Sequence, residues 1–161
     1  MEPQVTRPCC TTIQGHEGGV LAVDLVVVGL GYVGLPLAQA ASSAGLAVRG
    51  LDLNTDIVDG LNAGKSHVDD LSDTDIAAML GQGFRATTDA AVLGEADTIV
   101  ICVPTPLSDE GGPDLGAVLS ATRAIANTLH SGQLVILEST TYPGTTDEDV
   151  RPLLDLGRAH V

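Results

Sequence analysis

The residues 29–34, Gly-Leu-Gly-Tyr-Val-Gly, have types and a spacing that suit phosphate binding. They follow directly on the β-branched run Val26 to Val28 and precede an alanine-rich segment that reaches Ala44. In a G-x-G-x-x-G pattern the first glycine allows a tight turn, the second lets backbone approach a pyrophosphate, and the third lets a helix pack closely on the strand. The N-terminus of that helix then offers free N–H groups and a partial positive charge to phosphates.

An acidic residue follows the second strand of this strand–helix–strand unit. A second apolar run, 46–51, ends on Asp52, eighteen residues beyond Gly34, where a carboxylate can accept hydrogen bonds from a ribose 2′-hydroxyl. Strand, glycines, helix, strand and acid therefore predict a dinucleotide site. The alternative is an ordinary βαβ unit whose glycines serve packing only. Asp52 also favours NAD over NADP, because a carboxylate repels a 2′-phosphate and no arginine follows at once.

The composition limits the size of the protein and its partners. A chain of 161 residues suits one domain, and one Phe, two Tyr and no Trp mean a core of Ala, Val, Leu and Ile. A net charge of −14, from 21 acidic and 7 basic residues, argues against a nucleic-acid partner. No Lys or Arg lies between Asp24 and Val48, so backbone N–H groups and the helix dipole must bind the pyrophosphate.

The first 22 residues look like a flexible extension. They carry one Arg and no long apolar run, so we expect neither a secretory signal nor a membrane span. His16 has no second ligand at a useful spacing and is expected to be solvated. Cys9 and Cys10 are adjacent and Cys102 lies in an apolar run, so no disulfide framework or metal site emerges, which suits a reducing, cytoplasmic setting.

Further along the chain, strands and helices alternate. We expect strands at 84–87, 97–103 and 133–137, and helices at 54–62, 72–80, 89–93, 115–130 and 146–156, with caps at Asn54 or Thr55, Ser72 or Asp73, and Asp114, and with Gly157 ending the last helix. This alternation predicts an α/β fold, a Rossmann-type doubly wound parallel sheet of about five strands in the order 3-2-1-4-5. Arg123 and His130 are expected on the solvent-exposed face of their helix and not in a site.

Three separated motifs resemble one family. They are GLGYVGLPLA at 29–38, VPTPL at 103–107 and ESTTYPGTT at 138–146, and together they resemble the UDP-glucose/GDP-mannose dehydrogenase family over residues 23–156. The last motif is most similar to the branch that oxidises UDP-N-acetylhexosamines at C6. On this resemblance, residues 23–161 would be the NAD-binding Rossmann domain, without the catalytic and sugar-nucleotide domains.

The resemblance implies an NAD-dependent oxidoreductase of polysaccharide biosynthesis that takes a nucleotide-sugar alcohol to a carboxylate with two NAD. It implies that the glycine loop, with Tyr32 and Val33, and Asp52 contact NAD. It further implies that Thr105 and Thr140 line the nicotinamide side, and that Thr140 helps to hold the catalytic water. From the residues alone, both threonines also suit ordinary turns, because each lies beside Pro or Gly.

Two departures from the family pattern matter. Members often carry Lys or Arg five residues after the ribose acid, where this chain has Ile57, so a charge-assisted contact of about 1.5–3 kcal/mol would be lost. In the family, a cysteine nucleophile, a lysine and an Asn or Asp lie beyond the position of Val161. Cys102 is a poor substitute, because a thiol within an apolar strand has a raised pKa and little access. We therefore expect the 161 residues alone to bind NAD without oxidising sugar.

Three hypotheses follow. The first is the coenzyme-binding domain of a nucleotide-sugar dehydrogenase, which meets a UDP-sugar only in the full-length enzyme, here without the sixth strand and the dimerising helix. The second is a non-catalytic NAD-binding or interaction module, associating as a homodimer or through the unpaired sheet edge. The third, an unrelated Rossmann reductase such as a hydroxyacid dehydrogenase, leaves ESTTYPGTT unexplained.

Overall fold

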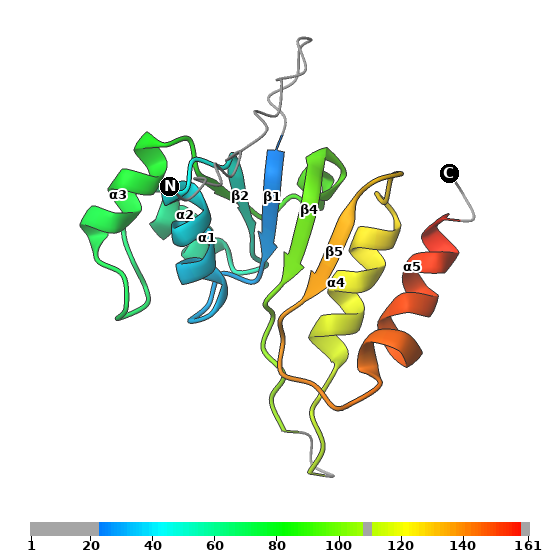
Figure 1. The fold of residues 1–161 in the computed structure, drawn as a ribbon. Coiled ribbons are helices and arrows are strands. Elements are labelled where there is room, and N and C mark those ends of the chain that lie inside the picture. The colour runs from blue at the N-terminus through cyan, green and yellow to red at the C-terminus, as the bar shows by residue number, and fades with distance from the viewer. Residues whose placement is uncertain (1–22, 108–110, 159–161) are drawn as a thin grey trace, which may run out of the picture.

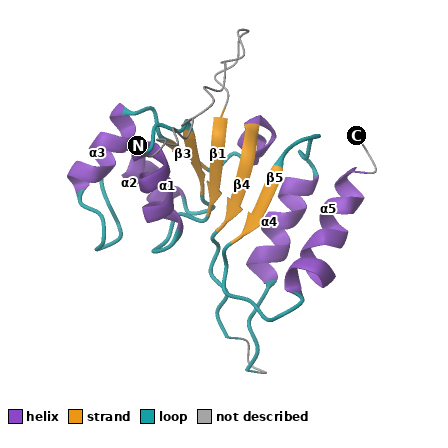
Figure 2. Ribbon diagram, in the orientation of Figure 1, coloured by secondary structure: helices purple, strands orange, loops and turns teal. Residues whose placement is uncertain are grey.

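The protein folds around one parallel sheet (Figure 1). The computed structural model describes residues 23–107 and 111–158. The expectations for residues 1–22, including those for Cys9, Cys10 and His16, lie outside the described residues. The strands run in the order β3-β2-β1-β4-β5, which confirms the predicted order; they are β1 (Val23–Val28), β2 (Val48–Leu51), β3 (Arg85–Thr87), β4 (Ala96–Ile101) and β5 (Leu134–Leu137). Because all five are parallel, their carboxyl ends share one edge of the sheet (Figure 2).

Helices cover both faces of this sheet. Helices α1 (Gly34–Ser43), α2 (Thr55–Asn62) and α3 (Asp73–Gly81) lie on one face, and α4 (Gly116–Ala126) and α5 (Arg151–Arg158) on the other (Figure 1). Side chains alternate along a strand, so Val27 packs with the first group while Val26 and Val28 pack with the second. Both faces of the sheet are therefore buried, as is typical of parallel sheets.

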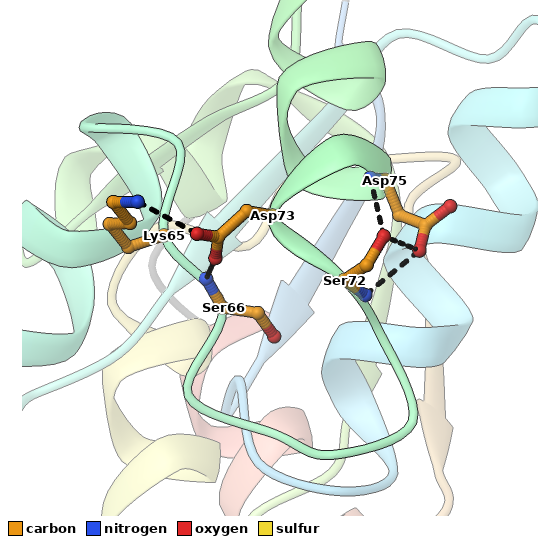
Figure 3. A network of polar contacts seen from close by, with 5 residues as sticks. All are labelled: Lys65, Ser66, Ser72, Asp73 and Asp75. Carbon is orange, nitrogen blue, oxygen red and sulfur yellow. Dashed lines mark hydrogen bonds and ion pairs between the residues drawn. The ribbon is translucent and has the colours of Figure 1, made fainter.

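Side chains cap the N-termini of α2 and α3. Asn54 caps α2 by accepting hydrogen bonds from two backbone N–H groups. Ser72 caps α3 in a reciprocal capping box with Asp75, in which the Asp75 carboxylate accepts the Ser72 N–H at 2.8 Å (Figure 3). Beside it, Asp73 pairs with Lys65 at 2.8 Å and accepts the Ser66 N–H. Of the alternative caps, Asn54 and Ser72 are the ones used.

Helix α4 is shorter than predicted. It begins at Gly116, with Leu115 at the cap position, although the Asp114 carboxylate still accepts the Gly116 N–H at 2.8 Å. It ends at Ala126 and not at residue 130, and just beyond this end the N–H and the hydroxyl of Thr128 both donate to the Ile125 carbonyl. His130 consequently lies beyond the helix, half-buried, with its Nε2 3.2 Å from the Ala96 carbonyl oxygen. His130 was expected on the solvent-facing side of this helix and is instead partly covered beyond its end, whereas Arg123 is exposed as expected.

Three other elements differ from the prediction. Strand β4 ends at Ile101, two residues early, and the predicted helix at 89–93 is a 3-10 helix, Ala90–Glu95. The last helix opens with a π-type turn, Thr146–Val150, and α5 continues through Gly157 to Arg158. Gly157 does not end the helix; it allows α5 to pack on α4, since a Cβ there would lie 2.3 Å from the Ala126 carbonyl oxygen.

Candidate functional site

The loop after β1 has the geometry that its glycines predicted. Gly29 adopts a positive φ of 91°, and a Cβ on it would lie 2.9 Å from the carbonyl oxygen of Cys102, directly after β4. A Cβ on Gly34 would lie 1.8 Å from the Gly29 carbonyl oxygen, so only glycine lets α1 begin this close to β1. A Cβ on Gly31 would meet nothing within 4 Å, so its backbone faces open space. Two glycines therefore serve the turn and the packing, and one leaves room for a ligand.

The N-terminus of α1 is available to an anion. No side chain caps it, and its first turn holds no acidic residue. The loop residues Tyr32 and Val33, which precede it, are 64% and 59% exposed. Backbone N–H groups and the helix dipole therefore point at a solvent-facing position, which is the arrangement that binds phosphate groups.

Asp52, at the end of β2, is bonded to this loop. One of its carboxylate oxygens accepts the Leu30 N–H at 2.8 Å, and the other accepts the Asn54 N–H at 2.9 Å. The side chain is half-buried, so its orientation is fixed by two backbone donors. Each carboxylate oxygen has a further lone pair with which it can accept a ribose hydroxyl.

A pocket of about 460 Å³ opens beside Asp52 at the carboxyl edge of the sheet. Its walls come from the ends of β1 and β2, the segments after β3 and β4, and one face of α4. They are formed by Val28, Gly29, Leu51, Asp52, Leu53, Asn54, Thr88, Ala90, Val103, Pro104, Gly116, Ala117, Ser120, Ala121 and Ala124. Most of these side chains are apolar or small, so the pocket can take a flat apolar ring while Asp52 provides the polar contact.

Thr105 and Thr140 meet at the same edge of the sheet. The Thr105 hydroxyl donates to the Thr140 carbonyl oxygen at 2.6 Å, although the two residues are 35 positions apart. Thr105 is half-buried and Thr140 is exposed. The structure thus brings together the two threonines that the sequence singled out, and it leaves the Thr140 side chain facing solvent.

Ile57 and Cys102 belong to the interior. Ile57 is half-buried and packs against the core on the α1 face of the sheet. Cys102 is 8% exposed, and burial together with the nearby charge of Glu138 raises the pKa of its thiol to about 11. A thiol in this setting is protonated and shielded, so the sequence-based expectation of an unreactive Cys102 agrees with the structure.

Sequence reasoning missed part of the site. It named neither the Leu30 N–H that holds Asp52 nor the face of α4 that forms a pocket wall. The signal for that face was present: Gly116, Ala117 and Ser120 begin a run of small residues at helical spacing. Within residues 23–107 and 111–158, no group of three His, Cys, Asp or Glu side chains could hold a metal ion. No helix in that part of the chain is long and apolar enough to cross a membrane.

The parallel sheet, the glycine loop, the bonded acid and the pocket between them define a dinucleotide-binding domain of the Rossmann class. Comparison with known proteins agrees, because the family model described as "UDP-glucose/GDP-mannose dehydrogenase family, NAD binding domain" matches residues 23–160. The chain belongs to this family, and NAD is the cofactor of the domain. The family rules out the unrelated Rossmann reductase considered above.

Relatives from several organisms support this assignment. NDP-N-acetyl-D-galactosaminuronic acid dehydrogenase of Ralstonia nicotianae is 45% identical over 125 residues, covering 76% of this chain and 29% of that protein. UDP-N-acetyl-D-mannosamine dehydrogenase of Escherichia coli is 44% identical over 124 residues, with the same coverage of 76% and 29%. The solved UDP-D-ManNAc dehydrogenase of Pyrococcus horikoshii superposes with a TM-score of 0.78 at 36% identity, covering 84% of this chain and 32% of that one. This chain therefore spans less than a third of the length of these relatives.

Proposed function

We propose that residues 23–161 are the coenzyme-binding domain of a nucleotide-sugar 6-dehydrogenase, which oxidises the C6 alcohol of a UDP-N-acetylhexosamine to a carboxylate. The observation that carries the proposal is the Asp52 carboxylate, bonded to the glycine loop and bordering a pocket of about 460 Å³. Relatives named for UDP-N-acetyl-D-mannosamine and NDP-N-acetyl-D-galactosaminuronic acid support the substrate class. They favour a dehydrogenase domain over a non-catalytic module.

The adenosine half of NAD would occupy the pocket beside Asp52. Its adenine would lie between Leu53 and the small residues of α4, and its ribose hydroxyls would donate to Asp52. The carboxylate accepts two backbone N–H groups and lines the pocket. An acidic side chain at this position repels a 2′-phosphate, so this site would prefer NAD to NADP.

The pyrophosphate would lie over the glycine loop. Gly31 gives it room, and the N–H groups around Tyr32, Val33 and Gly34 would donate to its oxygens. The stretch from Asp24 to Val48 contains no Lys or Arg, so these backbone donors must offset the phosphate charge. A side chain at position 31 should therefore weaken NAD binding more than it lowers the stability of the fold.

The nicotinamide half would extend toward the ends of β4 and β5. The sheet order puts β4 and β5 on the opposite side of β1 from Asp52, and a dinucleotide binds across that crevice. Thr105 and Thr140 would line this half, and the exposed Thr140 hydroxyl could hold the water that completes the oxidation. When bound there, each molecule of NAD would supply the hydride acceptor for one oxidation step, so the two steps would use two NAD.

The 161 residues by themselves would bind NAD without oxidising sugar. Cys102 is buried with a pKa near 11, and it does not offer the accessible thiolate that covalent capture of an aldehyde requires. The net charge of −14 and the biosynthetic relatives support a cytoplasmic protein without a nucleic-acid partner. Strand β5 is the last in the sheet and its Leu134 is 54% exposed, which supports association through that edge, including homodimer formation.

Calorimetric titration with NAD and, in parallel, NADP tests the proposal. We expect NAD to bind at least about tenfold more tightly than NADP, a difference of about 1.4 kcal/mol. Adding UDP-N-acetylmannosamine with NAD to the 161-residue protein should produce no NADH. A chain shown to be folded by circular dichroism that fails to bind NAD would contradict the coenzyme role, and NADH production would contradict the expectation that the 161 residues alone do not oxidise sugar.

A further inference from the structure

We infer that Ser139 is a positioning residue: its hydroxyl, together with that of Thr105, continues the pairing of β4 and β5 beyond the ends of both strands. This pairing holds the loop that carries Thr140 at the nicotinamide half of the coenzyme site. The inference rests on the proposed function, because it assigns Ser139 a part in that same site.

The pairing consists of three successive bonds at the carboxyl edge. The last backbone bond of the ladder joins the Glu138 N–H to the Ile101 carbonyl oxygen at 2.9 Å. Beyond it, the Ser139 hydroxyl donates to the Val103 carbonyl oxygen at 2.7 Å. Further out, the Thr105 hydroxyl donates to the Thr140 carbonyl oxygen at 2.6 Å. One hydroxyl donates from each segment, so the two bonds run in opposite directions.

Hydroxyl groups take the place of backbone donors here. The Cys102 N–H donates to β1, at the Val28 carbonyl, so by the alternation of a strand the Pro104 nitrogen also faces β1, where proline ends the ladder because it has no N–H. On the β5 side, the Val103 carbonyl accepts no backbone N–H within the described residues, and the Ser139 hydroxyl is its donor. Thr105 provides the next hydroxyl donor. The hydroxyls therefore keep the two segments together beyond the last backbone bond.

This pairing connects two halves of one site. Val103 and Pro104 line the pocket beside Asp52, while the partner segment carries Thr140. Thr140 takes part through its carbonyl oxygen, so its hydroxyl is not used in the pairing and its side chain remains exposed. Ser139 therefore fixes how far Thr140 lies from the pocket without itself facing the coenzyme.

The test compares NAD with ADP-ribose, which has the same adenosine, pyrophosphate and second ribose but no nicotinamide. Calorimetry would give both dissociation constants for the wild-type chain and for Ser139→Ala, Thr105→Val, Ser139→Thr and Ser66→Ala. Ser66 is the matched control, since its hydroxyl also donates to a backbone carbonyl, that of Val68, at 2.9 Å, but between α2 and α3.

We expect the wild-type chain to bind NAD more tightly than ADP-ribose. Ser139→Ala and Thr105→Val should each lower that preference by about 3- to 10-fold, the effect of losing one hydrogen bond. ADP-ribose affinity itself should stay within about twofold of wild type, because the adenosine pocket remains intact. Ser139→Thr, which keeps a hydroxyl, and Ser66→Ala should keep the wild-type preference.

Three results would overturn the inference. The first is an unchanged preference in Ser139→Ala. The second is an equal fall in affinity for both ligands, which would mean a general loss of structure. The third is equal affinity of the wild-type chain for NAD and ADP-ribose. A folded wild-type chain that binds neither ligand would instead refute the proposed function, so the two failures can be told apart.

Discussion

The carboxylate of Asp52 accepts the backbone N–H of Leu30 at 2.8 Å, across 22 residues of sequence. The acid that follows β2 is thereby bonded to the loop that follows β1. Hydrogen bonds to a charged group contribute about 1.5–3 kcal/mol, so this bond helps to fix the loop as well as the acid. A ligand that contacts either group therefore meets the other in a set position.

Replacing Asp52 by Asn should weaken the selection between coenzymes. The amide can still accept the Leu30 N–H through its oxygen, but it carries no charge to repel a 2′-phosphate. We expect the NAD-to-NADP affinity ratio to fall about tenfold or more, measured by calorimetry. Asp97→Asn is the control, because Asp97 is an exposed acid at the start of β4, at the opposite edge of the sheet. An equal change in both variants would mean that net charge alone sets the preference.

Alanine at Gly34 should lower stability, whereas alanine at Gly31 should lower NAD affinity. At Gly34 the new Cβ would lie 1.8 Å from the Gly29 carbonyl oxygen, and backbone must move to accommodate it. We expect the free energy of unfolding to fall by at least about 2 kcal/mol, measured by urea denaturation. At Gly31 the Cβ meets no protein atom within 4 Å, so stability should change little while NAD affinity falls. A Gly31→Ala variant that binds NAD normally would show that the pyrophosphate lies elsewhere.

The caps of α3 should make stability depend on pH. Hydrogen bonds from the Ser72 hydroxyl and N–H lower the pKa of the Asp75 carboxyl, and the Lys65 ammonium does the same for Asp73 (Figure 3). Because the pKa is lower in the folded state, this stabilisation is present above the unfolded pKa of about 3.9 and is lost as the pH falls through the folded pKa. Acidification should therefore destabilise the protein.

The variant Asp75→Asn isolates one of these carboxyls. We expect its melting temperature to lie below that of wild type near neutral pH, and the difference to shrink as the pH falls below about 4. Thr74→Ala, a neighbouring exposed position on α3 that carries no charge, should differ from wild type by the same amount at every pH. A difference for Asp75→Asn that stays constant with pH would contradict the assignment.

Cys102 should resist alkylation in the folded protein. With a thiol pKa of about 11, about one molecule in a thousand carries the thiolate at pH 8, and the residue is 8% exposed. In a Cys9→Ser/Cys10→Ser variant, iodoacetamide should modify Cys102 only after addition of urea, as followed by mass spectrometry. Labelling at equal rates with and without urea would reveal an accessible thiolate, and Cys102 would again be a candidate nucleophile.

The sequence by itself determined the local features of this protein. The order of glycines after Val28 predicted the turn and the helix, the residues Asn54 and Ser72 predicted two caps, and the alternation of elements predicted the strand order. These features succeed because each depends on neighbours within a few positions, or on the handedness rule that governs parallel crossovers. Where a boundary depended on a distant partner, as at Gly157 against Ala126, local reasoning placed it wrongly.

Only the tertiary structure decided which groups meet at the carboxyl edge. The bonds from Leu30 to Asp52, from Ser139 to Val103 and from Thr105 to Thr140 join residues 22, 36 and 35 positions apart. Their partners follow from the register of parallel strands, which is set by packing on both faces of the sheet and not by spacing along the chain. The residue types of the coenzyme site could be predicted, but their contacts required the folded sheet.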